Sequence, residues 1–241
     1  MSQNVVVIAA HAFEARAAAA VGRNMSREPW GQWMLYRGEL WELPYAVIRS
    51  GPGKVAAAAA TQAAIQYLEP WVLLSFGTAG CHDPSAPVGT VAAAIEVFDV
   101  ALAALGELPV HIPSRFEPEP ELVRQLLAVP GCGQARVACW EGHVASPAHR
   151  PPIAAHDGSG EMVVVDWESA AVAATAEMWK VPWGALKVVS DHGESERLKL
   201  LAHVARRPIQ WGAEVLRRAC DAFATSGVTT QANGNDEEAD G

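Results

Sequence analysis

The stretch NVVVIAA, residues 4–10, decides the fold class. Its valines and isoleucine follow one another without a polar interruption, which is typical of a strand that is buried on both faces. An alanine-rich stretch at 12–21 follows at once and has the composition of a helix. A buried strand that leads straight into a helix indicates an α/β architecture.

The same alternation of strands and helices continues along the chain. Further strands are predicted at 32–37, 45–50, 71–76, 88–95, 135–139, 162–165 and 183–189. Further helices are predicted at 54–68, 121–128, 167–179 and 198–224, the last either continuous or broken near Pro208. Proline and glycine punctuate 108–120 and 147–160, which we expect to be loops. The pattern predicts a single α/β domain around a central sheet.

The composition is that of one compact domain followed by a polar tail. Of the 241 residues, 50% are hydrophobic and 19% are charged, which excludes a disordered body. Residues 1–225 can bury a sizeable core without metal or disulfide staples, so we expect one domain there. Residues 226–241 are polar and acidic, and we expect them to form a disordered tail.

Charge and motif content narrow the expected partners. A net charge of −9 without a basic stripe disfavours nucleic acid and leaves a small molecule as the expected ligand. No run approaches the roughly 18 apolar residues of a membrane span, and the first residues lack a signal peptide. The four cysteines form no CxxC pair, so we expect reduced thiols in a cytoplasmic protein. Zinc spacing and dinucleotide fingerprints are missing, so no metal and no cofactor is expected.

Three carboxylates follow buried strands directly, and they mark the candidate site. Glu14 follows the first strand, Glu168 follows the 162–165 strand, and Asp191 follows the 183–189 strand. Each alone is explained by helix capping or by the helix dipole. Ligands of α/β sheets bind at the carboxyl ends of the strands, so the three together predict a site there.

Five short motifs occur in an order that resembles the nucleoside phosphorylase superfamily, on the branch of methylthioadenosine/S-adenosylhomocysteine nucleosidase. They are SGPGKVAA at 50–57, FGTAG at 76–80, VGTV at 88–91, DWESAAVA at 166–173 and VVSD at 188–191. The resemblance implies a single-domain αβα sandwich with a mixed, partly barrel-like central sheet. It also implies a homo-oligomer, commonly a dimer.

The resemblance implies a role for each of the three carboxylates. Asp191 would be the acid that protonates the purine at N7, and Glu168 would hold the ribose hydroxyls. Glu14 would position and deprotonate the attacking water. Breaking an N-glycosidic bond needs these groups, because the ribose gains cationic character while the departing base gains negative charge.

Further substrate contacts are implied by the same resemblance. Gly77 and Thr78 form the expected turn near the ribose, and Trp167 takes the place of the methionine that is usual beside the ribose-binding glutamate. Ser190 precedes the catalytic aspartate. The segment that lines the base falls on residues 140–144, which places His143 and Val144 against the purine.

The expected nucleophile is water. Related phosphorylases carry a phosphate-binding arginine just before the glycine turn, where this chain has Leu74-Ser75-Phe76, although Arg49 or Lys54 could supply a cation. The sequence therefore predicts a purine nucleosidase that hydrolyses a 5′-substituted adenosine. The alternatives are a hopanoid-associated or other purine nucleoside phosphorylase that uses phosphate, a futalosine hydrolase-like enzyme, and a nucleoside-binding module without catalysis.

Overall fold

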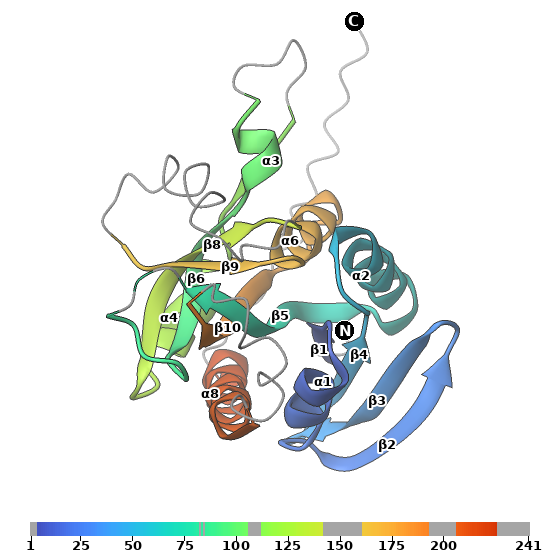
Figure 1. Cartoon of the computed structure of the whole chain (residues 1–241). Coiled ribbons are helices and arrows are strands. Elements are labelled where there is room, and N and C mark those ends of the chain that lie inside the picture. Colours follow the sequence, from blue (N-terminus) through green and yellow to red (C-terminus); the bar gives the residue numbers. More distant parts are fainter. Residues whose placement is uncertain are drawn as a thin grey trace, which may run out of the picture.

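The structure is a computed structural model that describes residues 4–81, 83, 85–105, 112–141, 161–192 and 206–225 (Figure 1). Its strands are β1 Asn4–Ala9, β2 Arg23–Trp30, β3 Trp33–Leu40, β4 Leu43–Arg49, β5 Pro70–Cys81, β6 Val91–Asp99, β7 Arg115–Phe116, β8 Cys132–Cys139, β9 Val163–Asp166 and β10 Trp183–Asp191. Its helices are α1 Ala12–Ala19, α2 Lys54–Leu68, α3 Val100–Ala103, α4 Pro120–Leu127, α6 Ser169–Met178 and α8 Arg206–Thr225.

Within the described residues the strands form one 10-stranded mixed sheet. The order is β10-β6-β8-β9-β5-β1-β4-β3-β2, and β7 pairs with β6. An additional pairing of β10 with β5 closes β5, β10, β6, β8 and β9 into a small barrel. The remaining strands extend from this barrel as an open wing. The mixed, partly barrel-like sheet expected from the sequence is thereby confirmed.

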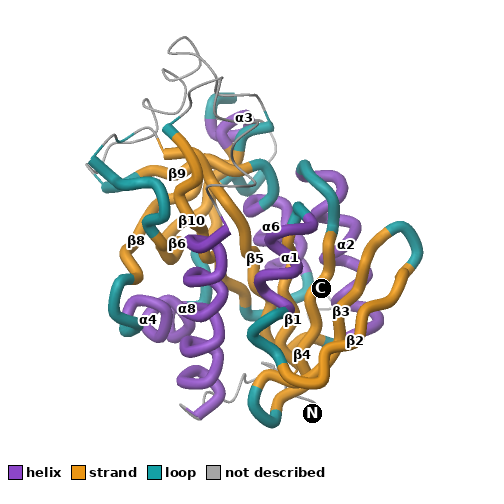
Figure 2. The backbone as a smooth tube through the Cα atoms, turned by 60° about the horizontal axis from the view of Figure 1, so that its bottom comes forward, coloured by secondary structure: helices purple, strands orange, loops and turns teal. Residues whose placement is uncertain are grey.

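Helices cover both faces of the sheet. The helices α1, α4 and α8 pack on one face, and Figure 2 shows α8 alongside α4. The helices α2 and α6 pack on the other face. Neighbouring residues of one strand serve different cores, because side chains alternate along a strand: Leu73 packs with α2 and α6, whereas Leu74 packs with α1 and α8.

The register of the parallel strands brings the candidate residues to one end of the sheet. β1 pairs in parallel with β4 and β5, and β5 pairs in parallel with β10. The carboxyl ends of these strands therefore lie together, with Glu14 shortly after β1 and Asp191 as the last residue of β10. Glu168 reaches the same region differently, because β9 before it pairs in the antiparallel direction with Gly80 and Cys81 at the end of β5. The β1 residues 5–9 are at most 2% exposed, so burial on both faces fixes this strand as predicted.

Two local expectations were wrong. The predicted strand 71–76 does not end in a turn at Gly77-Thr78-Ala79-Gly80, because these residues continue β5 to Cys81 by pairing with β10 and β9. The strand β2 was not expected. Its sequence RNMSREPW is polar and mostly exposed, and its pairing with β3 at the sheet edge provides its backbone partners.

The other expected elements lie close to their predicted places. The helix expected at 167–179 begins at Ser169, so Trp167 and Glu168 precede it. The expected loop at 108–120 contains the short strand β7 in its described part. The expected loop at 147–160, the start of the helix expected at 198–224, and the tail at 226–241 lie outside the described residues. None of the described helices is long and apolar enough to cross a membrane.

Candidate active site

Glu14 is held by three donors at the junction of β1 and α1. Its Oε1 accepts from the backbone N–H and from Oγ1 of Thr78, both at 2.7 Å, and its Oε2 accepts from the N–H of His11 at 2.8 Å. The side chain is 2% exposed. A Cβ at Gly77 would lie 3.0 Å from Oε1, so the glycine is what lets the carboxylate approach β5 so closely.

Glu168 lies at the start of α6 and contacts the glycine turn after β4. Its Oε1 accepts from the N–H of Gly53 at 2.8 Å. Gly53 has a φ of 93°, a conformation that favours glycine. The glycine turn therefore aims a backbone donor at Glu168.

The surroundings of Glu168 raise the pKa of its carboxyl group to about 7. Burial is the largest cause, and the charge of Asp166 adds to it, because both disfavour a second negative charge. The Gly53 N–H and the ammonium group of Lys187 act in the opposite direction, and Glu14 is close enough to raise the pKa further. Glu14 and Glu168 therefore belong to one electrostatic site.

A buried ion pair that the sequence analysis missed lies beneath Glu168. Lys187 Nζ is 2.8 Å from Asp166 Oδ2 and donates to Ser75 Oγ at 2.9 Å. Asp166 also accepts from the N–H and the hydroxyl of Ser169, so each charge is satisfied by neighbours. Burial is the largest influence and opposes the charge on Lys187, but the combined effect of Asp166, Glu168 and Glu14 outweighs it, so the pKa of the lysine is raised. The lysine inside the apolar strand WGALKVV was the sequence signal for this pair.

Asp191 ends β10 and is paired with the residue before it. The Ser190 hydroxyl lies 2.7 Å from Asp191 Oδ2 and 3.1 Å from the carbonyl oxygen of Ala79. Its single proton can therefore go to either acceptor. Asp191 also lies across from Gly80, where an added Cβ would meet Oδ1 at 3.5 Å. The two residues thus face the same stretch of β5 that holds Glu14.

The remaining predicted contacts fall in different places. Trp167 lies between Asp166 and Glu168 and is 37% exposed. His143 and Val144 lie outside the described residues.

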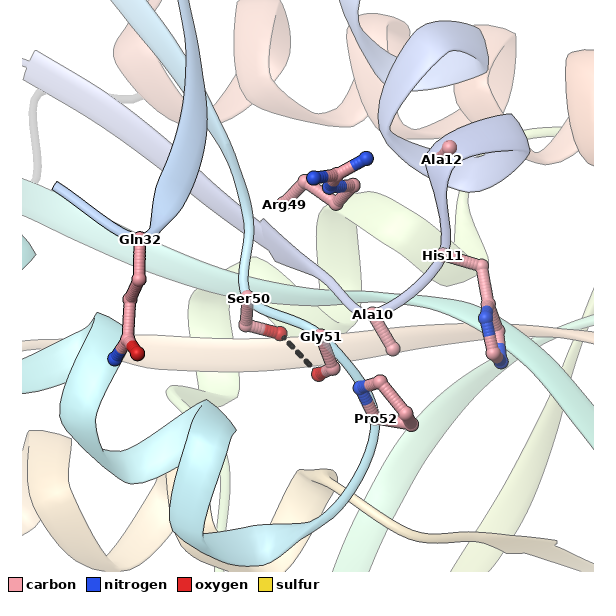
Figure 3. A pocket seen from close by; sticks show the side chains of 8 residues that line it. All are labelled: Ala10, His11, Ala12, Gln32, Arg49, Ser50, Gly51 and Pro52. Atoms are coloured by element: carbon pink, nitrogen blue, oxygen red, sulfur yellow. Dashed lines mark hydrogen bonds between the residues drawn. The ribbon is translucent and has the colours of Figure 1, made fainter. Parts of the chain in front are cut away.

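Of the two cations considered for phosphate, Lys54 is paired with Asp99, with 2.6 Å between Nζ and Oδ2. Arg49 instead lines a pocket of about 320 Å³ (Figure 3). No group of three or more potential metal ligands occurs among the described residues.

The family model of the phosphorylase superfamily matches residues 4–223. This chain belongs to that superfamily. The match includes all the described strands of the sheet and the described helices on both of its faces, apart from the last residues of α8. The superfamily assignment covers Glu14, Glu168 and Asp191 together, which agrees with the resemblance derived from the five motifs.

Members with known activity are similar to this superfamily chain in sequence and in fold. The 5′-methylthioadenosine/S-adenosylhomocysteine nucleosidase of Tolumonas auensis is 28% identical over 178 residues, which cover 67% of this chain and 74% of the relative. The Neisseria meningitidis enzyme of the same name, solved with methylthio-immucillin-A, superposes with a TM-score of 0.77 at 22% identity, covering 93% of this chain and 99% of its own. Futalosine hydrolase of Helicobacter pylori gives a TM-score of 0.82 at 19% identity, covering 92% and 99%.

Proposed function

We propose that the protein is a purine nucleosidase that hydrolyses the N-glycosidic bond of a 5′-substituted adenosine. The observation that carries this proposal is the arrangement around Glu14, whose carboxylate takes both donors of Thr78. The relatives whose names state a nucleosidase activity support the substrate class.

Glu14 is suited to orient a water molecule. A carboxylate has about four lone-pair directions, and three are used by Thr78 and His11. Among the described residues no donor takes the last one, on Oε2, and we assign it to a water on the ribose side. A carboxylate whose other bonds fix its position can hold that water in line for attack and accept its proton.

Glu168 and Asp191 complete the reaction in this proposal. Glu168 Oε1 is anchored by Gly53, and Oε2 accepts from the ribose hydroxyls, which places negative charge beside the developing ribosyl cation. Asp191 donates its proton to N7 of the departing base. When the Ser190 proton bonds to Ala79, Ser190 Oγ can accept from a protonated Asp191 and hold that acid in place.

The same geometry favours water over phosphate. The donors of Thr78 that would otherwise bind an oxyanion are occupied, and the negative charge of Glu14 repels one. Lys54 is engaged with Asp99, which leaves Arg49 as the cation nearest in sequence to the glycine turn. A phosphorylase stays the alternative because Arg49 lines an open pocket at the site.

A futalosine hydrolase is the second alternative, because such an enzyme shares the fold with a TM-score of 0.82. As further substrate contacts, we propose His143 and Val144 against the purine and Trp167 beside the ribose. We further propose that residues 1–225 form the catalytic domain, that 226–241 form a disordered tail, and that the protein acts as a cytoplasmic homodimer.

The deciding experiment is incubation of the purified protein with 5′-methylthioadenosine, with and without phosphate, followed by chromatography of the products. We expect free adenine and methylthioribose at the same rate in both buffers. Ribose 1-phosphate derivatives that form only with phosphate would assign a phosphorylase. Binding of the nucleoside without release of adenine would assign a binding module.

A further inference from the structure

The strand β10 is irregular at the point where it carries the proposed acid. It pairs in parallel with β5, with Val189 opposite Ala79 and Asp191 opposite Gly80. The step between these two pairs spans two residues on β10 but one on β5, so Ser190 is an extra residue. Such an extra residue bends a strand and re-aims the side chains beside it. Regular pairing is thus interrupted directly before Asp191, and other contacts have to help fix the direction of its side chain.

Side chains on both sides of Asp191 hold this irregular strand end. Before it, the Ser190 hydroxyl lies 3.1 Å from the carbonyl oxygen of Ala79 on β5. After it, His192 Nε2 lies 2.9 Å from the carbonyl oxygen of Ala86. A carbonyl oxygen only accepts, so His192 donates through Nε2–H, which is present in one neutral tautomer and in the charged ring. The contact is therefore compatible with either charge state of the histidine.

The acceptor of the histidine lies on a segment, residues 85–90, that is itself fixed to β10. Gly89 donates its N–H to the carbonyl oxygen of Val189 at 2.8 Å, and Val189 donates its N–H to that of Thr90 at 2.8 Å. These two bonds hold the segment beside β10 just before the strand becomes irregular. The histidine that follows the proposed acid thus binds an acceptor whose position the same strand has already fixed.

We propose that His192 is a positioning residue that fixes Asp191 for proton transfer to the purine. It rests on the proposed function, in which Asp191 donates to N7. Proton transfer needs the acid within hydrogen-bond distance of its acceptor, and an error of about 1 Å in position can lower the rate by up to about 10²-fold. Ser190 is not sufficient for this task, because its single proton is shared between Ala79 and Asp191. His192 supplies a second tether that does not depend on that proton.

The experiment compares two substrates that differ in their need for an acid. 5′-Methylthioadenosine releases adenine, which needs a proton to leave readily, whereas a p-nitrophenyl 5-methylthioriboside releases a phenolate that leaves without one. His192→Ala removes the tether, and His192→Gln restores an N–H donor near the place of Nε2. Thr90→Val is the matched control, because it removes a side-chain hydrogen bond to a carbonyl oxygen within the segment 85–90 and leaves His192 in place.

We expect the loss to depend on the leaving group. His192→Ala should lower kcat/KM for 5′-methylthioadenosine by about 10-fold and leave that for the nitrophenyl riboside within about 2-fold of the wild type. His192→Gln and Thr90→Val should stay within about 3-fold of the wild type with both substrates. An equal loss with both substrates in His192→Ala, or no loss with either, would overturn the positioning role.

Binding without turnover separates this proposal from the proposed function. Calorimetric titration compares two uncleavable carbocyclic analogues of 5′-methylthioadenosine, one with N7 and one with a C–H group in its place. We expect the wild type to bind the N7 compound about 5-fold or more tightly, and His192→Ala to reduce this preference to less than about 2-fold. That result without any cleavage of 5′-methylthioadenosine would support the positioning role and overturn only the proposed hydrolysis. A preference that is unchanged in His192→Ala would overturn the positioning role alone, and a wild type that binds neither analogue would overturn both proposals.

Discussion

The β1–α1 junction and the β9–α6 junction each present a glutamate to the site, but they hold it in different ways. Glu14 is buried, and three donors fix both of its oxygens. Glu168 is only partly buried, and among the described residues its one hydrogen-bond donor is the Gly53 N–H. The β1–α1 junction therefore fixes its carboxylate with donors from the protein itself. At the β9–α6 junction the described residues leave Oε2 of Glu168 available to a ligand.

This difference follows from what lies behind each carboxylate. Behind Glu14 is β5, which supplies a backbone and a hydroxyl donor from the single residue Thr78. Behind Glu168 is the buried ion pair of Lys187 and Asp166. The ammonium group of Lys187 is paired with Asp166. Burial and Asp166 then raise the pKa of Glu168 to about 7. A carboxyl group with a pKa near 7 can gain or lose a proton near neutral pH when a bound ligand changes its surroundings.

The largest expected effect comes from the acid outside both junctions. Asp191→Asn keeps the shape of the side chain but cannot donate a proton to the base, so kcat should fall by about 10²–10⁴-fold. The dissociation constant of an uncleavable nucleoside analogue should stay within a few-fold of the wild type. Asp221→Asn, on the outer helix α8, serves as the control and should leave both values unchanged. Activity of Asp191→Asn close to that of the wild type would exclude this residue as the acid.

Breaking the Glu14 junction should have the next largest effect. Glu14→Gln should lower kcat by at least about 10²-fold, because the amide cannot take a proton from water. Its NH₂ group would also face N–H and O–H donors, so thermal unfolding has to be measured beside the rate. Thr78→Val removes one donor and keeps the side-chain shape, and a smaller loss of about 10-fold is expected from it. Equal rates for wild type and both variants would mean that water is positioned elsewhere.

Breaking the Glu168 junction should affect binding more than chemistry. A charge-assisted hydrogen bond contributes about 1.5–3 kcal/mol, so Glu168→Gln should weaken an uncleavable nucleoside by about 10–100-fold. Free adenine lacks the ribose hydroxyls and should bind as it does to the wild type. The matched control is Glu177→Gln, at the exposed end of α6. If a 2′,3′-dideoxy analogue binds wild type as tightly as the riboside, Glu168 does not hold the hydroxyls.

The contrast between the junctions also shows what the sequence can reveal. Glu14, Glu168 and Asp191 could be found because each follows a buried apolar strand, a local pattern. The continuation of β5 through Gly77 and Thr78 could not, because it depends on pairing with two strands that are distant in sequence. When the partner strands are unknown, consecutive glycine and threonine residues indicate a turn rather than the continuation of a strand.

The support beneath Glu168 was hidden for a similar reason. Lys187 and Asp166 lie on different strands, and only the closure of the barrel brings their charges to 2.8 Å. The edge strand β2 was missed because most of its residues are polar and exposed, and a periodicity rule detects only strands with a clearly buried face. Local patterns therefore single out the three candidate carboxylates, while the neighbours that orient them could be identified only from the tertiary structure.

The smallest expected effect is a pH dependence that belongs to the Glu168 junction alone. The pKa of this carboxyl is about 7 in the free protein, above the ordinary glutamate value, so raising the pH from 6 to 8 converts most of it to the carboxylate. Ribose hydroxyls donate to the carboxylate, so the affinity for an uncleavable nucleoside should rise over this range, by about 10-fold for a pKa near 7. Calorimetric titrations at pH 6, 7 and 8 measure this change. Glu168→Gln removes the titrating group and should give a flat profile, and free adenine should show no Glu168-dependent change. A rise that persists in Glu168→Gln would assign the titration to another group.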